Sequence, residues 1–294
     1  TTDGTGGSAS ALTTVTVSAA NDPPIAVNDF TNTVEDVAVT IQALVNDIDV
    51  DGDTLTITSV SPTNGTASIS GTNVVFTPAT NFVGTATIGY TISDGGNTAS
   101  ALITVTVTAV NDPPIARNDF TNTVEDVSVT IQALVNDSDV DGDTLTITSV
   151  SPASGTASIS GTNVVFTPAI NFVGIATIGY SISDGNGGSA SALITVTVNA
   201  ANDPPIAVND VTNTVEDVSV TIQALVNDSD VDGDTLTITS VSPTNGTASI
   251  SGTNVLFTPA TNFVGTATIG YSISDNRGGT ASALITVAVT GAQD

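Results

Sequence analysis

The sequence predicts an all-β fold built from tandem β-sandwiches, and three features support this prediction. The string Asn-Asp-Pro-Pro recurs at Asn21, Asn111 and Asn202, and the blocks between these positions are nearly identical. A repeat of about 90 residues is long enough to bury a hydrophobic core of its own. Within each repeat, short runs rich in Val, Ile and Thr alternate apolar with polar residues, which is typical of strands with one buried face.

The repeat divides the chain into three complete units and a short leading segment. We expect repeats at residues 21–110, 111–201 and 202–294. Residues 3–20 match residues 184–201 closely, so residues 1–20 are interpreted as the last strand of a truncated preceding repeat. The alternative is a strand that pairs with another molecule. Truncation is favoured because each complete repeat already contains its own final strand.

Strand and turn signals alternate along each repeat. In the first repeat, apolar residues occupy alternate positions in residues 37–41, 55–57 and 101–107. Glycine-containing turn signals separate such runs, for example at Asn64-Gly65 and Gly71-Thr72-Asn73. Short strands with turns every 8–12 residues or so indicate a sandwich of about seven strands.

The aromatic residues of the first repeat have two possible roles, core packing or stacking on a sugar. Phe76 and Tyr90 lie within apolar runs, and the chain has no tryptophan, the strongest stacking residue. We therefore expect core positions for the aromatic residues of this repeat, namely Phe30, Phe76, Phe82 and Tyr90.

The composition excludes most catalytic chemistry. The 294 residues include 29 acids and two arginines but no lysine, histidine or cysteine, and the formal net charge is −27. The chain therefore lacks an imidazole base, a thiol nucleophile and the usual zinc ligands. Hydrolysis by a carboxylate pair remains formally open, but a catalytic site is usually unique, whereas the acids here recur at equivalent positions. We predict that the chain is not an enzyme.

The charge balance indicates cations as partners. A chain this acidic repels nucleic acid and anionic membrane surfaces. No apolar run approaches the roughly 20 residues that a membrane helix requires. We therefore expect neither nucleic-acid binding nor membrane insertion.

The acids are clustered. Nine of them recur at matching positions in every repeat, while residues 54–93 contain none. A solubilising surface would mix charges of both signs. Clustered carboxylates repel one another unless a hard cation neutralises them, and sites rich in oxygen ligands suit Ca²⁺. The sequence therefore predicts calcium as the cofactor, and the alternative is a solvated acidic turn.

The loop of residues 47–53, with the sequence DIDVDGD, is the most specific of these clusters. Its alternating aspartates and Gly52 copy the first half of an EF-hand loop. The twelfth position is Thr58 instead of a bidentate glutamate. The loop must therefore take further ligands from elsewhere in the chain.

The order of these motifs resembles that of the cadherin repeat, and more closely the bacterial cadherin-like repeats of large adhesins. The linker reads Ala-Val-Asn-Asp-Pro-Pro at residues 109–114, and Val34-Glu35 stands where cadherins have Pro-Glu. Asp47-Ile48-Asp49 matches the Asp-x-Asp motif, and Asp94-Gly95-Gly96 matches the Asp-Gly-Gly turn. The resemblance covers essentially the whole chain and implies seven-stranded Greek-key sandwiches of cadherin-like or Ig-like type.

The resemblance also implies that calcium binds where consecutive repeats meet. The first complete junction would use Glu35, Asn111, Asp112, Asp137, Asp139 and Asp184, with Asp143 as a further ligand. The second would use Glu125, Asn202, Asp203, Asp228, Asp230 and Asp275, with Asp234. The partial junction at the start retains Asn21, Asp22, Asp47, Asp49 and Asp94. The remaining candidate ligands are Asp51, Asp53, Asp141, Glu216 and Asp232.

Two departures from the cadherin pattern limit the number of ions. The mid-domain Asp-Arg-Glu motif and the first linker aspartate have no counterpart here. We therefore expect one or two ions per junction instead of three.

These features together predict a calcium-stiffened extracellular spacer of a bacterial surface adhesin or extracellular fibre. Its partners would be calcium, the neighbouring repeats of the same chain and other copies in a fibre, at the cell surface or outside the cell. The alternative is a carbohydrate- or protein-binding accessory module of a secreted protein, which an exposed aromatic row or a repeat-specific loop would favour.

Overall fold

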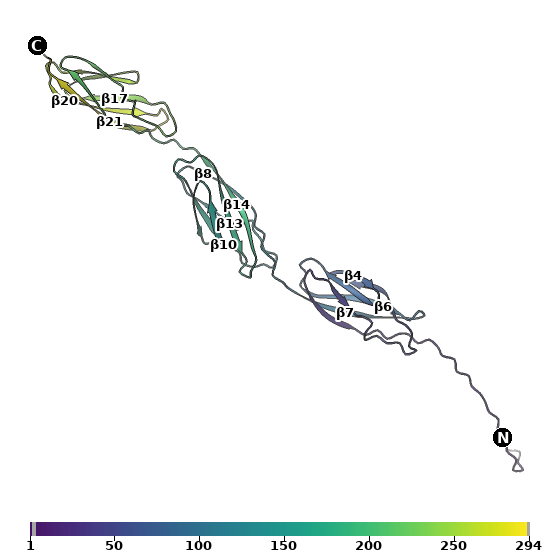
Figure 1. The fold of residues 1–294 in the computed structure, drawn as a ribbon. Helices are drawn as coiled ribbons and strands as arrows, with labels where there is room; N and C mark the ends of the chain where they lie inside the picture. Colours follow the sequence, from purple (N-terminus) through teal and green to yellow (C-terminus); the bar gives the residue numbers. More distant parts are fainter. Residues whose placement is uncertain (2–3, 293–294) are drawn as a thin grey trace. The chain divides into compact units, whose positions relative to one another are not determined.

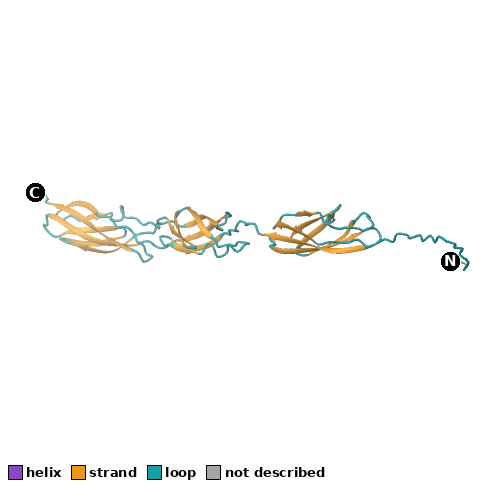
Figure 2. Cartoon of the chain, turned by 90° about the horizontal axis from the view of Figure 1, so that it is seen from below, coloured by secondary structure: helices purple, strands orange, loops and turns teal. Residues whose placement is uncertain are grey.

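The computed structural model describes residue 1 and residues 4–292, and these residues form 21 strands without a helix (Figures 1 and 2). In this part of the chain, no helix is long or apolar enough to cross a membrane. The predicted all-β fold is confirmed.

Each repeat contributes seven strands at equivalent positions. In the first repeat they are β1 (Asp29–Val34), β2 (Val39–Ile41), β3 (Thr56–Pro62), β4 (Gly65–Ser70), β5 (Asn73–Pro78), β6 (Gly84–Ser93) and β7 (Thr98–Thr108). In the second they are β8 (Asp119–Val124), β9 (Val129–Ile131), β10 (Thr146–Pro152), β11 (Gly155–Ser160), β12 (Asn163–Pro168), β13 (Gly174–Ser183) and β14 (Ser189–Asn199). In the third they are β15 (Asp210–Val215), β16 (Val220–Ile222), β17 (Thr237–Pro243), β18 (Gly246–Ser251), β19 (Asn254–Pro259), β20 (Gly265–Ser274) and β21 (Thr280–Thr290).

The seven strands of each repeat form two sheets. In the first repeat the larger sheet has the order β1-β7-β6-β3 and the smaller sheet the order β2-β5-β4. The other two repeats have the same arrangement. β1 runs parallel to β7, whereas the other strand pairs of this repeat are antiparallel. The predicted seven-stranded sandwich is confirmed.

Two-residue turns make the hairpins of the smaller sheets. β4 and β5 pair up to Ser70 and Asn73, which leaves Gly71 and Thr72 as the turn. Gly71 has a φ of 63°, a left-handed conformation that glycine adopts without steric cost. The turn predicted here from the sequence is therefore present.

Each repeat buries a core made of its own residues. In the first repeat, Val74 and Phe76 of β5 pack with Ile88 and Tyr90 of β6, and all four are at most 1% exposed. The second and third repeats bury the matching residues. Because no core cluster mixes residues from two repeats, each sandwich has its own source of stability.

The core prediction for the aromatic residues is correct for three of the four. Phe76 and Tyr90 are buried, and Phe82 packs against the core from its edge. Phe30 is 77% exposed, so its predicted core position is wrong. In β1 the less exposed positions belong to Asp29, Thr31 and Thr33, which puts Phe30 on the outer face. Val37 also differs from the prediction, because it precedes β2 and is 50% exposed.

The leading segment forms no strand within its described residues, which are residue 1 and residues 4–20. Its apolar residues Leu12, Val15 and Val17 are 96%, 76% and 87% exposed. The matching strand β14 pairs on one side with β13 and on the other with β8. A strand forms only where such partners are available, so the origin of this segment in a preceding repeat stays a prediction.

Candidate metal centres at the acidic loops

The acidic loop of the first repeat lies between β2 and β3 and turns around Asp49. The Oδ1 atom of Asp49 accepts hydrogen bonds from the backbone N–H groups of Asp51 (2.9 Å) and Asp53 (3.3 Å). Gly52 has a φ of 81°, which lets the chain reverse at this point. Carboxylate oxygens of Asp49, Asp51 and Asp53 lie within 4.8 Å of one another. Equivalent clusters contain Asp139, Asp141 and Asp143, and Asp230, Asp232 and Asp234.

Some of these carboxylate oxygens are buried without a donor. Oδ2 of Asp49 and Oδ2 of Asp230 are inaccessible and accept no hydrogen bond from the described residues. A buried anionic oxygen without a partner raises the free energy of the folded state. A hard divalent cation would supply the missing positive charge, and carboxylate oxygens are the ligands that Ca²⁺ prefers.

The linker before each repeat is bound to the acidic loop. The backbone N–H of Asp22 donates to Oδ2 of Asp51 at 2.8 Å, and the N–H of Asp203 donates to Oδ2 of Asp232 at 2.8 Å. A backbone bridge between Ile25 and Ile48 holds the same two segments together further along. These contacts bring the linker backbone to the loop carboxylates, and in the third repeat they place the carboxylate of Asp203, which the sequence predicts as a ligand, within 4.8 Å of that of Asp232.

The early glutamate of each repeat holds the opposite end of the sandwich. Glu35 is 5% exposed, and its Oε1 accepts a hydrogen bond from the backbone N–H of Val110 at 2.7 Å. Glu125 is 4% exposed and accepts from Ala201 at 2.6 Å. Glu216 accepts from Ala292 at 2.8 Å. Each glutamate therefore lies where the last strand of its repeat passes into the linker.

Early glutamates and linker aspartates meet in two carboxylate groups. Glu125, Asp203 and Asp232 each offer an oxygen within 4.8 Å of the others, and Glu35, Asp36 and Asp112 form a second such group. Partial burial, and then the charges of Asp232 and Glu125, raise the pKa of Asp203. Its Oδ2 is buried and accepts no hydrogen bond from the described part of the chain.

Asp36 is the one member of these groups that the sequence did not suggest as a ligand. It has a φ of 57°, and its Oδ1 accepts a hydrogen bond from the backbone N–H of Asn81 at 3.2 Å. This left-handed conformation turns the chain between β1 and β2. Aspartate adopts such a conformation more readily than most residues. This tendency was the only feature of the sequence that could have pointed to Asp36.

Asp47 has a different environment from the other loop aspartates. It is 8% exposed, its Oδ1 accepts a hydrogen bond from the backbone N–H of Val27 at 2.7 Å, and the Tyr90 hydroxyl lies 3.0 Å from the same oxygen. Asp137 and Asp228 have the same contacts with Tyr180 and Tyr271. The carboxylate groups defined above do not include these three aspartates. In the structure they satisfy a buried tyrosine hydroxyl, as the interior requires.

Each of the three repeats matches the family model of the bacterial Ig domain, over residues 21–106, 111–197 and 202–288. The chain belongs to the bacterial Ig domain family. The expected resemblance to Ig-like and cadherin-like repeats is thereby confirmed. No match was found among curated proteins.

Solved structures show the same fold as these Ig domains. The extracellular domain of protocadherin gamma B4 matches 93% of the chain at 17% identity with a TM-score of 0.55, and the chain covers 51% of it. The EC3-6 cis-dimer structure of protocadherin gamma B7 matches 92% at 13% identity with a TM-score of 0.53, and the chain covers 74% of it. An endo-fucoidan hydrolase of glycoside hydrolase family 107 matches 93% at 18% identity, and the chain covers 45% of it. Its TM-score of 0.27 is too low to support a functional argument.

The aspartate before the last strand of each Ig domain caps a turn. In the third domain, Asp275 is 2% exposed and accepts hydrogen bonds from the N–H groups of Arg277 (2.7 Å) and Gly279 (2.9 Å). The side-chain amide of Asn202 donates to its Oδ2 at 2.7 Å. The amide of Asn202, followed by the backbone donors, lowers the pKa of Asp275. Asp94 and Asp184 cap the equivalent turns of the other two domains.

A second carboxylate beside each buried tyrosine introduces a pH dependence. Burial, and then the charge of Asp47, raise the pKa of Asp29, although a hydrogen bond with Tyr90 opposes the shift. Oδ2 of Asp29 is buried and accepts no hydrogen bond from the described residues. A carboxyl whose pKa is raised by folding favours the folded state below its unfolded pKa, and this contribution is lost as the pH rises through the folded pKa.

Replacing the three equivalent aspartates with asparagine, in the variant Asp29→Asn, Asp119→Asn and Asp210→Asn, should therefore raise Tm at pH 7. We expect a rise on the order of 5 °C, because an amide removes the buried charge and can donate to Asp47 or its counterparts. At pH 3 the parent and the variant should melt at similar temperatures, since the parent carboxyls are then protonated. Calorimetry at both pH values tests this, and equal Tm values at pH 7 would contradict it.

Proposed function

We propose that the chain is an extracellular spacer whose Ig domains are stiffened by calcium at their junctions. The observation that carries this proposal is the group formed by Glu125, Asp203 and Asp232, whose oxygens lie within 4.8 Å of one another. One of these residues belongs to the second Ig domain, one to the linker and one to the third domain. An ion bound to all three would join the two domains.

The donor set favours calcium over other metals. The residues offer carboxylate oxygens, and the chain has no histidine or cysteine. Zinc and copper sites in proteins generally use nitrogen or sulfur ligands. Ca²⁺ accepts six to eight oxygen ligands in flexible geometry, which suits a group assembled from a linker and two domains. When bound, the ion would neutralise carboxylates that otherwise repel one another.

A spacer role is supported by the repetition. Near-identical domains joined by short Asn-Asp-Pro-Pro linkers suit a segment whose role is to span a distance. Proline fixes its own φ and restricts the residue before it, so these linkers have little conformational freedom. The Ig fold is typically non-enzymatic, and we propose that this chain is catalytically inert and located outside the cell.

Calcium binding and thermal stability test the proposal together. In a calcium titration of the full chain, we expect heat of binding and a rise in the free energy of unfolding. The rise should be about 2.7 kcal/mol at a concentration one hundred times the dissociation constant, which corresponds to roughly 10 °C or more in Tm. Magnesium should act more weakly, because it demands octahedral geometry and dehydrates reluctantly. Absence of both heat and a Tm shift at millimolar calcium would refute the proposal.

One observation favours the alternative of a carbohydrate-binding module. Phe30 and Phe120 are 77% and 78% exposed at equivalent positions of two domains. Phe120 borders an open hollow of about 340 Å³ that is also lined by Thr121, Asn122, Thr197 and Asn199. An exposed ring beside hydroxyl and amide groups can stack on a sugar. The third domain has Val211 at this position, so glycan binding abolished by Phe30→Ala with Phe120→Ala would favour the alternative.

A further inference from the structure

The third Ig domain differs from the other two in the turn before its last strand. The turn reads Asp-Asn-Arg-Gly-Gly from Asp275, whereas the second domain has Asp-Gly-Asn-Gly-Gly from Asp184. The first domain has a turn that is one residue shorter, Asp-Gly-Gly-Asn. Arg277 is one of only two arginines in a chain with no lysine. A positive charge at this position is therefore specific to the third domain.

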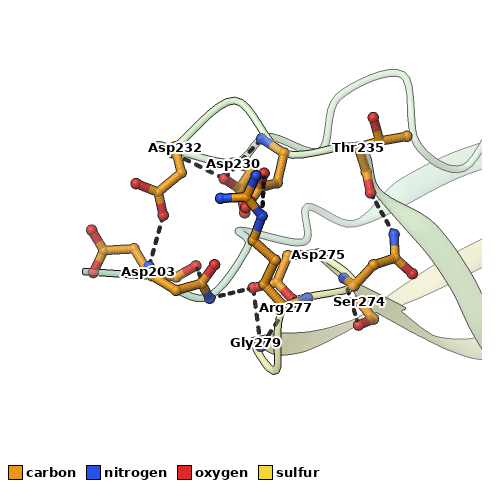
Figure 3. Close-up of polar contacts among 11 residues, drawn as sticks. Asp203, Asp230, Asp232, Thr235, Ser274, Asp275, Arg277 and Gly279 are labelled. Atoms are coloured by element: carbon orange, nitrogen blue, oxygen red, sulfur yellow. Dashed lines mark hydrogen bonds and ion pairs between the residues drawn. The ribbon is translucent and has the colours of Figure 1, made fainter. Parts of the chain in front are cut away.

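Arg277 contacts the acidic loop of the same domain. Its Nε atom lies 3.1 Å from Oδ1 of Asp234 (Figure 3). The side chain of Asp234 is 10% exposed, whereas that of Arg277 is 66% exposed. Asp234 belongs to the loop group with Asp230 and Asp232. The arginine thus lies at one edge of a loop group that shares Asp232 with the junction group that we propose as a calcium site.

The arginine leaves this group incompletely neutralised. Oδ2 of Asp234 and Oδ2 of Asp230 are both buried, and neither accepts a hydrogen bond from the residues that the structure describes. One guanidinium therefore faces three clustered carboxylates, two of which keep a buried oxygen without a donor. A further positive charge would stabilise such oxygens. The group can still attract a cation, but the arginine already partly compensates its charge.

The backbone of Arg277 is held in the turn, whereas its side chain is mostly exposed to solvent. Its N–H donates to Asp275 at 2.7 Å, and a Cβ on Gly279 would overlap Oδ2 of Asp275 and the Cα of Pro204. The turn is therefore tightly packed. The exposed guanidinium can leave Asp234 without disturbing this turn, so an incoming ion can displace it.

The same contacts connect the arginine to the linker. The amide of Asn202 donates to Asp275 at 2.7 Å, and the N–H of Asp203 donates to Asp232 at 2.8 Å (Figure 3). The linker thus contacts both the turn that carries Arg277 and the loop that Arg277 neutralises. An ion pair between turn and loop holds these contacts together without a metal.

We propose that Arg277 is a built-in cation of the third acidic loop, which competes with calcium for Asp234. The third loop therefore binds calcium more weakly than the first and second loops, and it keeps its order at lower calcium concentrations. This inference rests on the proposed calcium function. It adds that the junctions of one chain respond to different calcium concentrations.

Exchanging residues between equivalent turns tests the inference. Calcium binding to the full chain is measured by competition with a chromophoric chelator, for the parent and for Arg277→Asn, which installs the residue of the second domain. Removing a unit charge about 5 Å from a divalent ion should strengthen binding of the weakest class of sites about tenfold. The reciprocal variant Asn186→Arg should weaken one of the stronger sites by a similar factor.

Arg117→Val provides the matched control. It removes the other arginine, which is exposed, and Val27 and Val208 occupy the equivalent positions of the other domains. The backbone N–H that donates to Asp137 is retained. The affinity of the weakest class of sites should therefore stay within about twofold of the parent, since Arg117 belongs to the second Ig domain and not to the third, and exposed charges are screened by salt.

The outcomes separate this inference from the function on which it rests. If calcium binds and Arg277→Asn leaves every affinity unchanged, the inference is wrong and the calcium function stands. If Arg277→Asn and Arg117→Val strengthen binding equally, the effect is one of net charge and the inference is also wrong. If no variant binds calcium at millimolar concentrations, both fail.

Discussion

Replacing Phe166 with alanine should unfold the second Ig domain far below the melting temperature of its neighbours. Phe166 of β12 is fully buried and packs in a core with Ile178 and Tyr180. Truncating a buried phenylalanine generally costs about 3–5 kcal/mol, which in a domain of this size lowers Tm by roughly 15–30 °C. The first and third domains should keep their melting temperatures, because their cores contain no residue of the second.

Differential scanning calorimetry distinguishes this result from a general loss of stability. The variant should show a separate low-temperature transition with about one third of the total unfolding enthalpy, since enthalpy scales with the number of residues that unfold. Phe120→Ala is the matched control, because it makes the same chemical change at a position that is 78% exposed. It should alter the free energy of unfolding by at most about 0.5 kcal/mol. An equal fall in the melting temperatures of all three domains would contradict the independence of their cores.

The difference between Phe166 and Phe120 also shows how far the sequence could predict the fold. In β7 the period-two pattern is unambiguous, and Ile103, Val105 and Val107 are buried as predicted. In β1 the only large apolar residues, Phe30 and Val34, alternate with a face made of Asp29, Thr31 and Thr33. β1 lies at the edge of its sheet, where pairing with β7 sets which face points inward. A shift of one residue exchanges the two faces, and nothing local in β1 determines the choice.

In the acidic loops, too, some features follow from the local sequence and others depend on residues far away in the chain. The grouping of Asp49, Asp51 and Asp53 follows from their spacing and Gly52, and the sequence predicts it. The role of Asp47 depends on Tyr90, which is 43 positions away and donates from another strand. By spacing alone Asp47 resembles its loop neighbours, although its carboxylate lies in a buried network. Assigning it to either environment requires the packing of β6 against the loop.

Neutralising Glu125 and Asp203 at the second junction should prevent calcium from stiffening that joint, while the first joint should still respond to calcium. The variant combines Glu125→Gln with Asp203→Asn. The amide oxygen of glutamine can still accept the 2.6 Å hydrogen bond from Ala201, so the second domain should keep its fold. Two unit charges about 4 Å apart repel by about 1 kcal/mol in water and by more where solvent is excluded. The substitutions remove this repulsion together with two charged ligands.

Distances between introduced labels can report each joint separately. The chain contains no cysteine, so a pair of introduced cysteines is labelled specifically. Ser70, Ser160 and Ser251 are exposed at equivalent strand ends of the three domains. Labels at 160 and 251 span the second joint, and labels at 70 and 160 span the first. With spin labels, pulsed electron–electron double resonance then gives the width of each distance distribution.

In the parent, calcium should narrow both distributions, because an ion shared by two domains restricts their relative motion. In the Glu125→Gln, Asp203→Asn variant, the 160–251 distribution should stay broad in calcium while the 70–160 distribution still narrows. The first joint thus serves as an internal control for folding, labelling and calcium activity. If calcium narrows the 160–251 distribution of the variant as much as that of the parent, the carboxylate group is only a solvated acidic surface. If calcium leaves both parental distributions unchanged, linker contacts such as that of Asp203 with Asp232 determine the flexibility of the joint without an ion.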